Sequence, residues 1–319
     1  MKKLLAVLAL ALASACAFAQ DNYPVKPIRL VLSTAPGGAV DALGRIMATE
    51  LAKHLGQPVV VENRGGANGN LAGETVARAA PDGYTLLQTS GGTLTTNPHL
   101  YAKMPYDPLK DLAPVTQVAL NPLWLVVRND LPAQTLQEFV AYLKANPNKA
   151  NYASAGPGSA LHIAQEAFAR ATGVAAVQVP YKGAGPALAD VVSGQVDFVW
   201  DPGPALRQVA GGRVRILAVG APRRIPVAAN VPTVAEAGYP GFNTASAHAL
   251  LAPAGTPQPV IDRLNRDAVK ALQTAEVRDR IRGLGIEPIG NTPQEAAADI
   301  RAEHARLGRL VREANIKVD

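Results

Sequence analysis

Runs of apolar residues alternate with segments of helical periodicity along the first hundred residues. The run Ile28–Leu32 predicts a buried strand, and the apolar positions from Val40 to Leu55 recur at the spacing of one helix face. Further strands are predicted at 59–62 and 84–89, with a helix between them. Buried strands separated by helices are typical of a parallel sheet that is covered on both faces.

The same alternation restarts in the middle of the chain, after an extended segment at 115–127. A second extended segment, at 245–253, precedes a helical C-terminal part. We therefore predict an α/β fold of two domains joined by two crossover segments, which can close around a ligand. Strands of the second half are predicted at 152–154, 177–180, 197–200 and 215–219, with a helix at 160–171. The predicted divisions are 1–19 as a leader, 20–120 plus 250–319 as domain 1, and 121–249 as domain 2.

Threonine and glutamate three residues apart mark three predicted helix starts. This capping-box spacing begins at Thr135, Thr233 and Thr292. Another helix is predicted to open at Thr256-Pro257, with its apolar positions at Leu264, Val269, Leu272 and Val277.

Two glycine-rich turns stand between a predicted strand and a predicted helix. The first contains Pro36, Gly37 and Gly38, and the second spans 154–162. Glycine lets backbone N–H groups approach a ligand closely, and a helix N-terminus adds partial positive charge. A single turn of this kind is a common connection between a strand and a helix. Two of them, one on each predicted domain, favour a binding site for an anion between the domains.

The N-terminus predicts export. Lys2 and Lys3 precede an apolar stretch that ends in Ala17-Phe18-Ala19, the pattern of a cleaved signal peptide. Cys16 is the single cysteine and lies before that cleavage site, although a lipid anchor on it is an alternative. A mature chain without cysteine excludes disulfides and thiol catalysis. The net charge of +6 is scattered, with no basic-aromatic cluster that would indicate nucleic-acid binding.

An ordered set of motifs carries a family resemblance. The chain contains, in this order, the segments YPVKPIRLVLSTAPGG, GQPVVVENR, AAPDGYTLL, NYASAGPGS, VPYKGAGPAL and VPTVAEAG, and the resemblance covers about residues 23–317. Together they resemble the substrate-binding proteins of tripartite tricarboxylate transporters, the Bug family. The resemblance implies a two-domain, type II-like periplasmic binding-protein fold. It also implies a small carboxylate in the cleft, gripped by backbone amides and waters and delivered to a membrane permease.

All but one of the candidate ligand-binding residues lie on the stretches that match the family's pocket loops, and Asp201 follows a predicted strand whose end faces the pocket. Asp41 and His162 are expected to support their loops, since a carboxylate at position 41 would repel an anion. Ser159 is also a plausible helix N-cap, and Asp201 a residue that caps the turn after its strand. The full set of candidates is Pro36, Gly37, Gly38, Asp41, Ser90, Thr93, Ser154, Gly158, Ser159, His162, Tyr181 and Asp201.

These observations predict a periplasmic, monomeric solute-binding protein for a di- or tricarboxylate, an aromatic acid or an acidic amino acid. Its predicted partners are the permease subunits of a tripartite tricarboxylate transporter. No catalytic or nucleotide motif is found, so we expect no enzyme activity, cofactor or metal. A ligand-sensing protein that presents its closed form to a receptor ectodomain needs the same cleft and stays open as an alternative.

Overall fold

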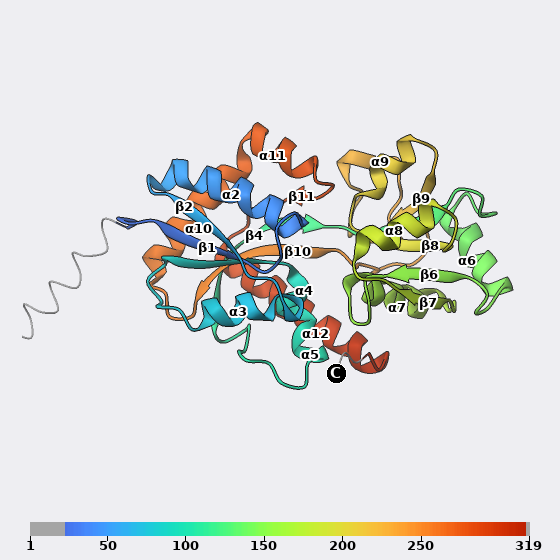
Figure 1. Ribbon diagram of the computed structural model, residues 1–319, viewed down its shortest axis with the longest axis horizontal. Coiled ribbons are helices and arrows are strands. Elements are labelled where there is room, and N and C mark those ends of the chain that lie inside the picture. The colour runs from blue at the N-terminus through green and yellow to red at the C-terminus, as the bar shows by residue number, and fades with distance from the viewer. Residues whose placement is uncertain (1–22, 317–319) are drawn as a thin grey trace, which may run out of the picture.

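A computed structural model describes residues 23–316 and shows two lobes, each built on one sheet (Figure 1). The predicted signal peptide and Cys16 lie outside the described residues. We call the lobe of the six-stranded sheet the first lobe and that of the five-stranded sheet the second lobe. The chain passes between them twice, after β4 and before β10.

The sheet of the first lobe has the strand order β11-β4-β10-β3-β1-β2. Strand β1 lies between two parallel neighbours, with Leu30 opposite Val61 of β2 and Leu86 of β3. Strand β10 is antiparallel to both β3 and β4, so the sheet is mixed where the apolar pattern predicted a parallel one. The strands are β1 (Ile28–Leu32), β2 (Val59–Asn63), β3 (Thr85–Thr89), β4 (Leu112–Asn121), β10 (Ser246–Pro253) and β11 (Glu287–Pro288).

The sheet of the second lobe has the order β7-β6-β8-β5-β9. Strand β6 is parallel to β7 and β8, whereas β5 is antiparallel to β8 and β9. Its core is rich in aromatic side chains, among them Trp124, Phe168 and Trp200, which are fully buried. The strands are β5 (Trp124–Arg128), β6 (Asn151–Ser154), β7 (Val177–Pro180), β8 (Phe198–Asp201) and β9 (Val214–Val219).

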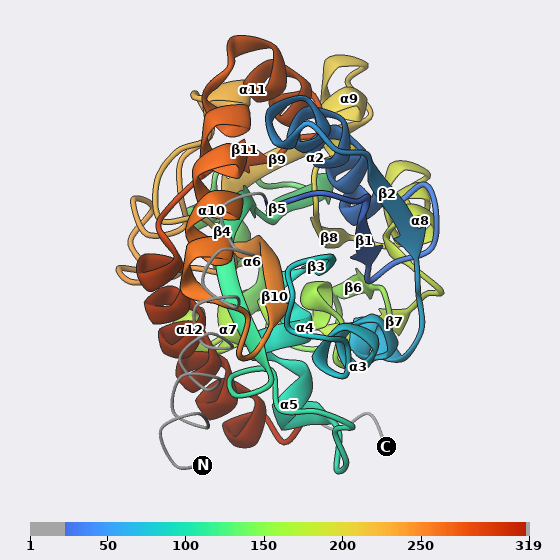
Figure 2. The same ribbon diagram turned by 90° about the vertical axis from the view of Figure 1, so that its left-hand side faces the viewer.

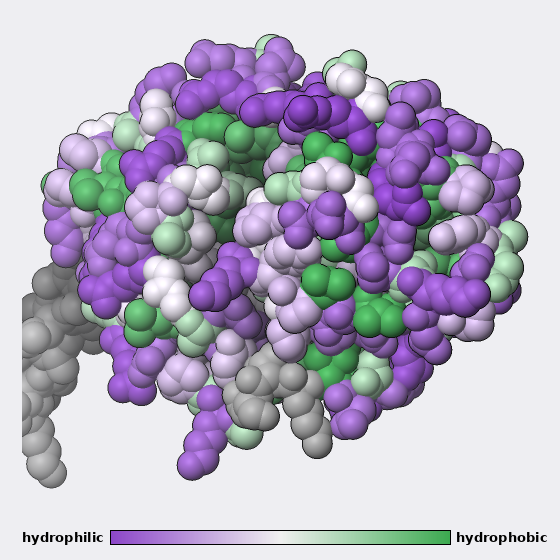
Figure 3. All heavy atoms as spheres, turned by 45° about the vertical axis from the view of Figure 1, so that its right-hand side comes forward, coloured by the Kyte–Doolittle hydropathy of each residue, from purple (hydrophilic) through white to green (hydrophobic). Residues whose placement is uncertain are grey.

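Helices cover both sheets. In the first lobe they are α2 (Ala39–Leu55), α3 (Asn70–Ala77), α4 (Gly91–Thr95), α5 (Asn97–Leu100), α10 (Gln258–Gln273), α11 (Ala275–Arg282) and α12 (Pro293–Glu313), with a 3-10 turn η1 (Ala67–Gly69). In the second lobe they are α6 (Leu136–Ala145), α7 (Ala160–Thr172), α8 (Ala184–Val192) and α9 (Ala205–Ala210), with η2 (Pro226–Ala228). Figure 3 shows one face of the molecule, on which hydrophilic residues predominate.

Helix α12 connects the two lobes. It begins with the predicted capping box, in which the hydroxyl of Thr292 accepts from the N–H of Glu295. Figure 2 shows it running along one side of the molecule, past α10, and its far end reaches α7. There Leu307 and Val311 pack with Ile163 of α7 in a small buried cluster. The C-terminal helix is therefore placed where it can contribute to any site between the lobes.

Two predicted helices differ in the structure. Thr233 and Glu236 exchange the hydrogen bonds of a capping box, yet the chain there forms a turn and no helix. The helix predicted to open at Thr256-Pro257 and to contain Val277 ends at Gln273, because Thr274 is extended and caps a separate helix, α11, on which Val277 lies. Within residues 23–316 no helix is long and apolar enough to cross a membrane.

Candidate functional site

A cleft of about 910 Å³ lies between the two lobes. The first lobe lines it with the loops that follow β1, β2 and β3, and the second lobe with the turn from β6 into α7. Ligands of open α/β sheets bind beyond the carboxyl ends of the strands, and these four loops stand at such ends. The crossover segments contribute Asn121 and 244–246, and α12 contributes the side chains from Glu303 to Leu310 that face inward.

Five of the twelve candidate residues line this cleft, and they come from both lobes. They are Pro36, Ser90 and Thr93 from the first lobe, and Gly158 and Ser159 from the second. The hydroxyl of Ser159 accepts from the N–H of His162 (3.3 Å), so Ser159 caps α7 and keeps its own proton for another acceptor.

The other seven lie outside the lining, and Gly37, Gly38 and Asp41 among them build the turn into α2. The N–H of Gly37 donates to Oδ2 of Asp41 (3.0 Å), and Asn63 Nδ2 donates to Oδ1 (2.8 Å). Arg45 pairs with the same carboxylate at 3.0 Å. Burial raises the pKa of Asp41, but hydrogen bonds from Arg45, Gly37 and Asn63 outweigh it and lower the pKa to about 2. Asp41 therefore joins the loop after β1 to the end of β2.

Replacing Asp41 with alanine is expected to lower the free energy of unfolding by about 2 kcal/mol at pH 7, the equivalent of its pKa shift. Because the folded pKa lies below the ordinary value, this contribution is present above about pH 4 and is lost as the pH falls to 2. Urea unfolding of the wild type and of Asp41→Ala at pH 7 and at pH 2 measures this contribution. The exposed Asp262→Ala is the control, and an equal loss in both variants would contradict the role of Asp41.

Ser154 and His162 hold the corresponding turn in the second lobe. Ser154 Oγ accepts from Gln178 Nε2 (2.8 Å) and from the N–H of Gly156 (3.2 Å). Nδ1 of His162 accepts from the N–H of Gly158 (3.1 Å), which fixes this nitrogen as unprotonated. Both side chains thus position the start of α7.

Tyr181 and Asp201 also have partners within the second lobe. The hydroxyl of Tyr181 donates to Oδ2 of Asp190 (2.6 Å). Oδ1 of Asp201 accepts from the N–H groups of Gly203 and Ala205, both at 2.8 Å, which is the turn-capping alternative recognised from the sequence. Burial raises the pKa of Asp201. Neither side chain lines the cleft.

Polar side chains of the first lobe hold the cleft loops to one another. The hydroxyl of Thr93 donates its proton to the carbonyl of Asn68 (3.1 Å). The hydroxyl of Ser90 therefore donates in the contact between Ser90 Oγ and Thr93 Oγ1 (3.3 Å). Thr89 donates to Ser33 Oγ at 2.8 Å, which leaves the proton of Ser33 for another acceptor. Ser33 lines the cleft and was not predicted, although it directly follows β1.

Charged groups are sparse in the cleft. Among the described lining residues Glu303 and Arg306 carry charge, and they pair with one another on α12. The N-termini of α2 and α7 both open toward the cleft, and the first N–H groups of a helix have no acceptor inside it. The site can therefore hold an anion by hydroxyls, amides and helix ends without a free cationic side chain.

Sequence reasoning missed the residues that tertiary packing brings to the cleft. Asn121, Ser246 and His248 lie on strands β4 and β10, and Arg306 lies on a regular helix. Their neighbours along the chain form ordinary strand and helix patterns.

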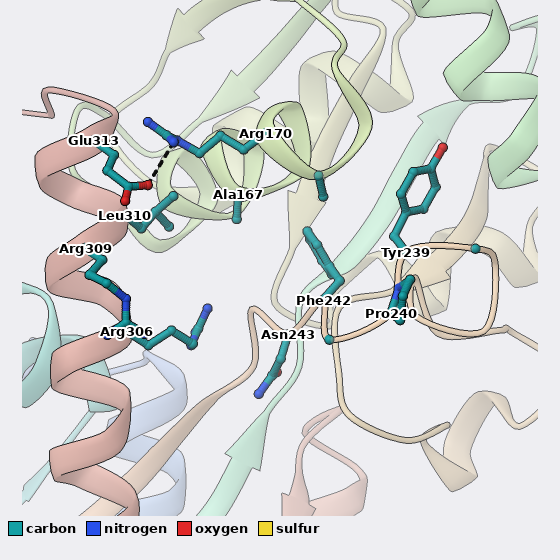
Figure 4. A pocket seen from close by; sticks show the side chains of 13 residues that line it. Ala167, Arg170, Tyr239, Pro240, Phe242, Asn243, Arg306, Arg309, Leu310 and Glu313 are labelled. Atoms are coloured by element: carbon teal, nitrogen blue, oxygen red, sulfur yellow. Dashed lines mark hydrogen bonds and ion pairs between the residues drawn. The ribbon is translucent and has the colours of Figure 1, made fainter.

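A second groove, of about 670 Å³, adjoins the cleft, because Ala167, Arg306 and Leu310 line both. Figure 4 shows Arg170 of α7 and Glu313 of α12 pointing toward one another beside it, and their ion pair spans 2.9 Å. The two side chains are 42% and 57% exposed, so the pair contributes about 0–1 kcal/mol. This contact between the lobes is weak.

Comparisons with known proteins agree with this arrangement. The family model described as the tripartite tricarboxylate transporter family receptor matches residues 43–316. The structure of the periplasmic binding protein BugD is 34% identical with a TM-score of 0.77, covering 93% of this chain and all of that one. The match confirms the predicted two-lobed binding-protein fold and the resemblance to the Bug family.

Two similar structures contain carboxylates. MatC from Rhodopseudomonas palustris, with bound malate, is 37% identical with a TM-score of 0.76 and covers 91% of this chain and all of that one. Rpa4515 from R. palustris, with adipate, is 35% identical with a TM-score of 0.82 and covers 93% of this chain and all of that one.

Proposed function

Because this chain belongs to the tripartite tricarboxylate transporter receptor family, we propose that it captures a small carboxylate in the periplasm and delivers it to a membrane permease. The observation that carries the proposal is the composition of the cleft. Two helix N-termini face it, as do Ser33 and Ser159, whose hydroxyl protons remain available to an acceptor, while its charged pair is neutralised internally. Such a site suits a carboxylate, which accepts several hydrogen bonds at once.

The two lobes supply different parts of the grip. Ser90 and the loop after β1 approach from the first lobe, and Gly158 and Ser159 approach from the second. A ligand bound to both lobes stabilises the closed arrangement, which a permease can distinguish from the open one. Adipate and malate in similar proteins support a dicarboxylate as the first ligand class to examine.

Thermal and urea unfolding with a panel of dicarboxylates, tricarboxylates, aromatic acids and acidic amino acids tests binding. A ligand at about a hundredfold excess over its Kd is expected to raise the free energy of unfolding by about 2.7 kcal/mol. Neutral sugars at the same concentrations serve as the control. Stabilisation by a sugar, with none by any carboxylate, would overturn the proposal.

Delivery is a separate step with its own test. Vesicles that contain the tripartite permease are expected to take up the identified carboxylate when the purified protein is added outside. Uptake that is equally fast without the protein would contradict delivery while leaving binding intact. It would then favour a sensing role.

A further inference from the structure

Buried polar atoms of two side chains at the cleft lack a partner among the residues that the structure describes: both ring nitrogens of the buried His248 and the Oδ1 of the half-buried Asn121. His248 on β10 lines the cleft, is 2% exposed, and neither of its imidazole nitrogens has a hydrogen-bond partner within residues 23–316. Asn121 on the neighbouring strand β4 also lines the cleft, and its Oδ1 is buried without a partner among the same residues. Buried polar groups are almost always hydrogen-bonded, so each such exception calls for an explanation.

The strand register puts these two side chains on one face. Ser246 is opposite Asn121 and His248 is opposite Ala119, so His248 and Asn121 are diagonal neighbours across the pair of strands. Such neighbours stand roughly 7–8 Å apart in an antiparallel pair. That separation leaves room for one small polar group to contact both.

The chemistry of the two residues selects the kind of group. Burial lowers the pKa of His248 to about 4, so its ring is neutral near pH 7, with one nitrogen that donates and one that accepts. Asn121 offers an accepting oxygen. A second carboxylate placed here would be buried without a cation, since Arg306 already pairs with Glu303. A hydroxyl, which donates and accepts, matches both residues.

We propose that His248 and Asn121 form a subsite for a hydroxyl group on the bound carboxylate, so that this protein selects hydroxy acids over the same acids without the hydroxyl. The subsite rests on the proposed function, because it orients a ligand whose carboxylate is held by the loops of the two lobes. His248 donates to the hydroxyl oxygen, and Asn121 Oδ1 accepts the hydroxyl proton.

Calorimetric titration with matched acids tests the subsite. The pairs are succinate with malate, propionate with lactate, and benzoate with 4-hydroxybenzoate. In at least one pair we expect the hydroxylated acid to bind about tenfold more tightly or better, because a site built to hydrogen-bond a hydroxyl rejects the analogue that lacks it. His248→Leu is expected to reduce this ratio to about twofold or less, while the acid without the hydroxyl keeps its affinity.

Two further variants separate the subsite from general effects. His248→Gln, which keeps a donor and an acceptor, is expected to retain much of the preference. Gln88→Leu is the matched control: Gln88 is also buried on this sheet with its amide atoms unpartnered among residues 23–316, but it does not line the cleft. It is expected to leave the ratio unchanged.

The outcomes distinguish the subsite from the binding function. A preference that survives His248→Leu, or that Gln88→Leu abolishes equally, overturns the subsite, as does the absence of any preference in the wild type. In those cases carboxylate binding still stands. If no acid of either kind binds, the proposed function fails and the subsite fails with it.

Discussion

Replacing Gly65 with valine is expected to weaken carboxylate binding by about a hundredfold or more, because it separates two loops that form one wall of the cleft. A Cβ atom at position 65 would lie 2.9 Å from the backbone nitrogen of Ala35 and 3.3 Å from the carbonyl carbon of Thr34. Both atoms belong to the backbone, so no side chain can turn away. The loop after β1 must move. Losing two hydrogen bonds to a charged carboxylate, at about 1.5–3 kcal/mol each, is enough for a loss of this size, since about 1.4 kcal/mol corresponds to tenfold in Kd.

Calorimetric titration of Gly65→Val with a carboxylate that the ligand panel shows to bind measures the loss, and urea unfolding measures the accompanying destabilisation. Overpacking at one position typically costs about 1–3 kcal/mol, which leaves a folded protein in which binding can be measured. Gly185→Val is the matched control, because a Cβ there meets nothing within 4 Å and the residue lies on α8, away from the cleft. Unchanged affinity in Gly65→Val would show that this wall does not contact the ligand.

The elements of the fold could be predicted where local physics determines them. Strand β1 lies at the predicted residues 28–32, and the capping boxes at Thr135 and Thr292 open α6 and α12. The same motif at Thr233 failed, because a capping box satisfies a turn as well as it does a helix. The direction of β10 could not be predicted either, since antiparallel pairing depends on how the chain returns from the second lobe.

The site could be predicted at the level of loops but not of side chains. The predicted turns at strand ends are among the loops that line the cleft, because ligands of such sheets bind beyond the carboxyl ends of the strands. Within those turns, short polar side chains serve the turn first: Asp41, Ser154 and Asp201 each accept from nearby N–H groups. Their partners depend on the folded loop, so the sequence alone could not separate ligand-facing residues from supporting ones.

His248 could not be identified from its own surroundings in the chain. The segment around it has the pattern of an apolar strand. Strand periodicity predicts which face of the sheet a side chain lies on, but not which part of the protein, or which cleft, lies against that face. The face becomes part of the cleft only because β10 runs between β3 and β4 and the second lobe lies beyond their ends. Residues of this kind depend on tertiary structure and are the ones that sequence reasoning misses.

Acidification from about pH 6.5 to pH 4 is expected to lower the free energy of unfolding of both proteins. The decrease in the wild type is expected to be about 3 kcal/mol larger than the decrease in His248→Leu. Burial lowers the pKa of His248 from 6.5 to about 4 in the folded protein. Between these values the unfolded chain binds a proton that the folded protein does not, so stability falls as the pH falls, and a shift of this size corresponds to about 3 kcal/mol.

The difference between variants isolates this effect from other groups. Burial also lowers the pKa of His99, but His99 is present in both proteins and its contribution cancels. Urea unfolding at pH 7 and pH 4 gives the two free energies for each variant. Gln88→Leu, which removes an equally buried polar side chain that does not titrate, is expected to keep the full acid loss of the wild type. An acid loss of the same size in His248→Leu would mean that the imidazole is already solvated or paired in the folded protein.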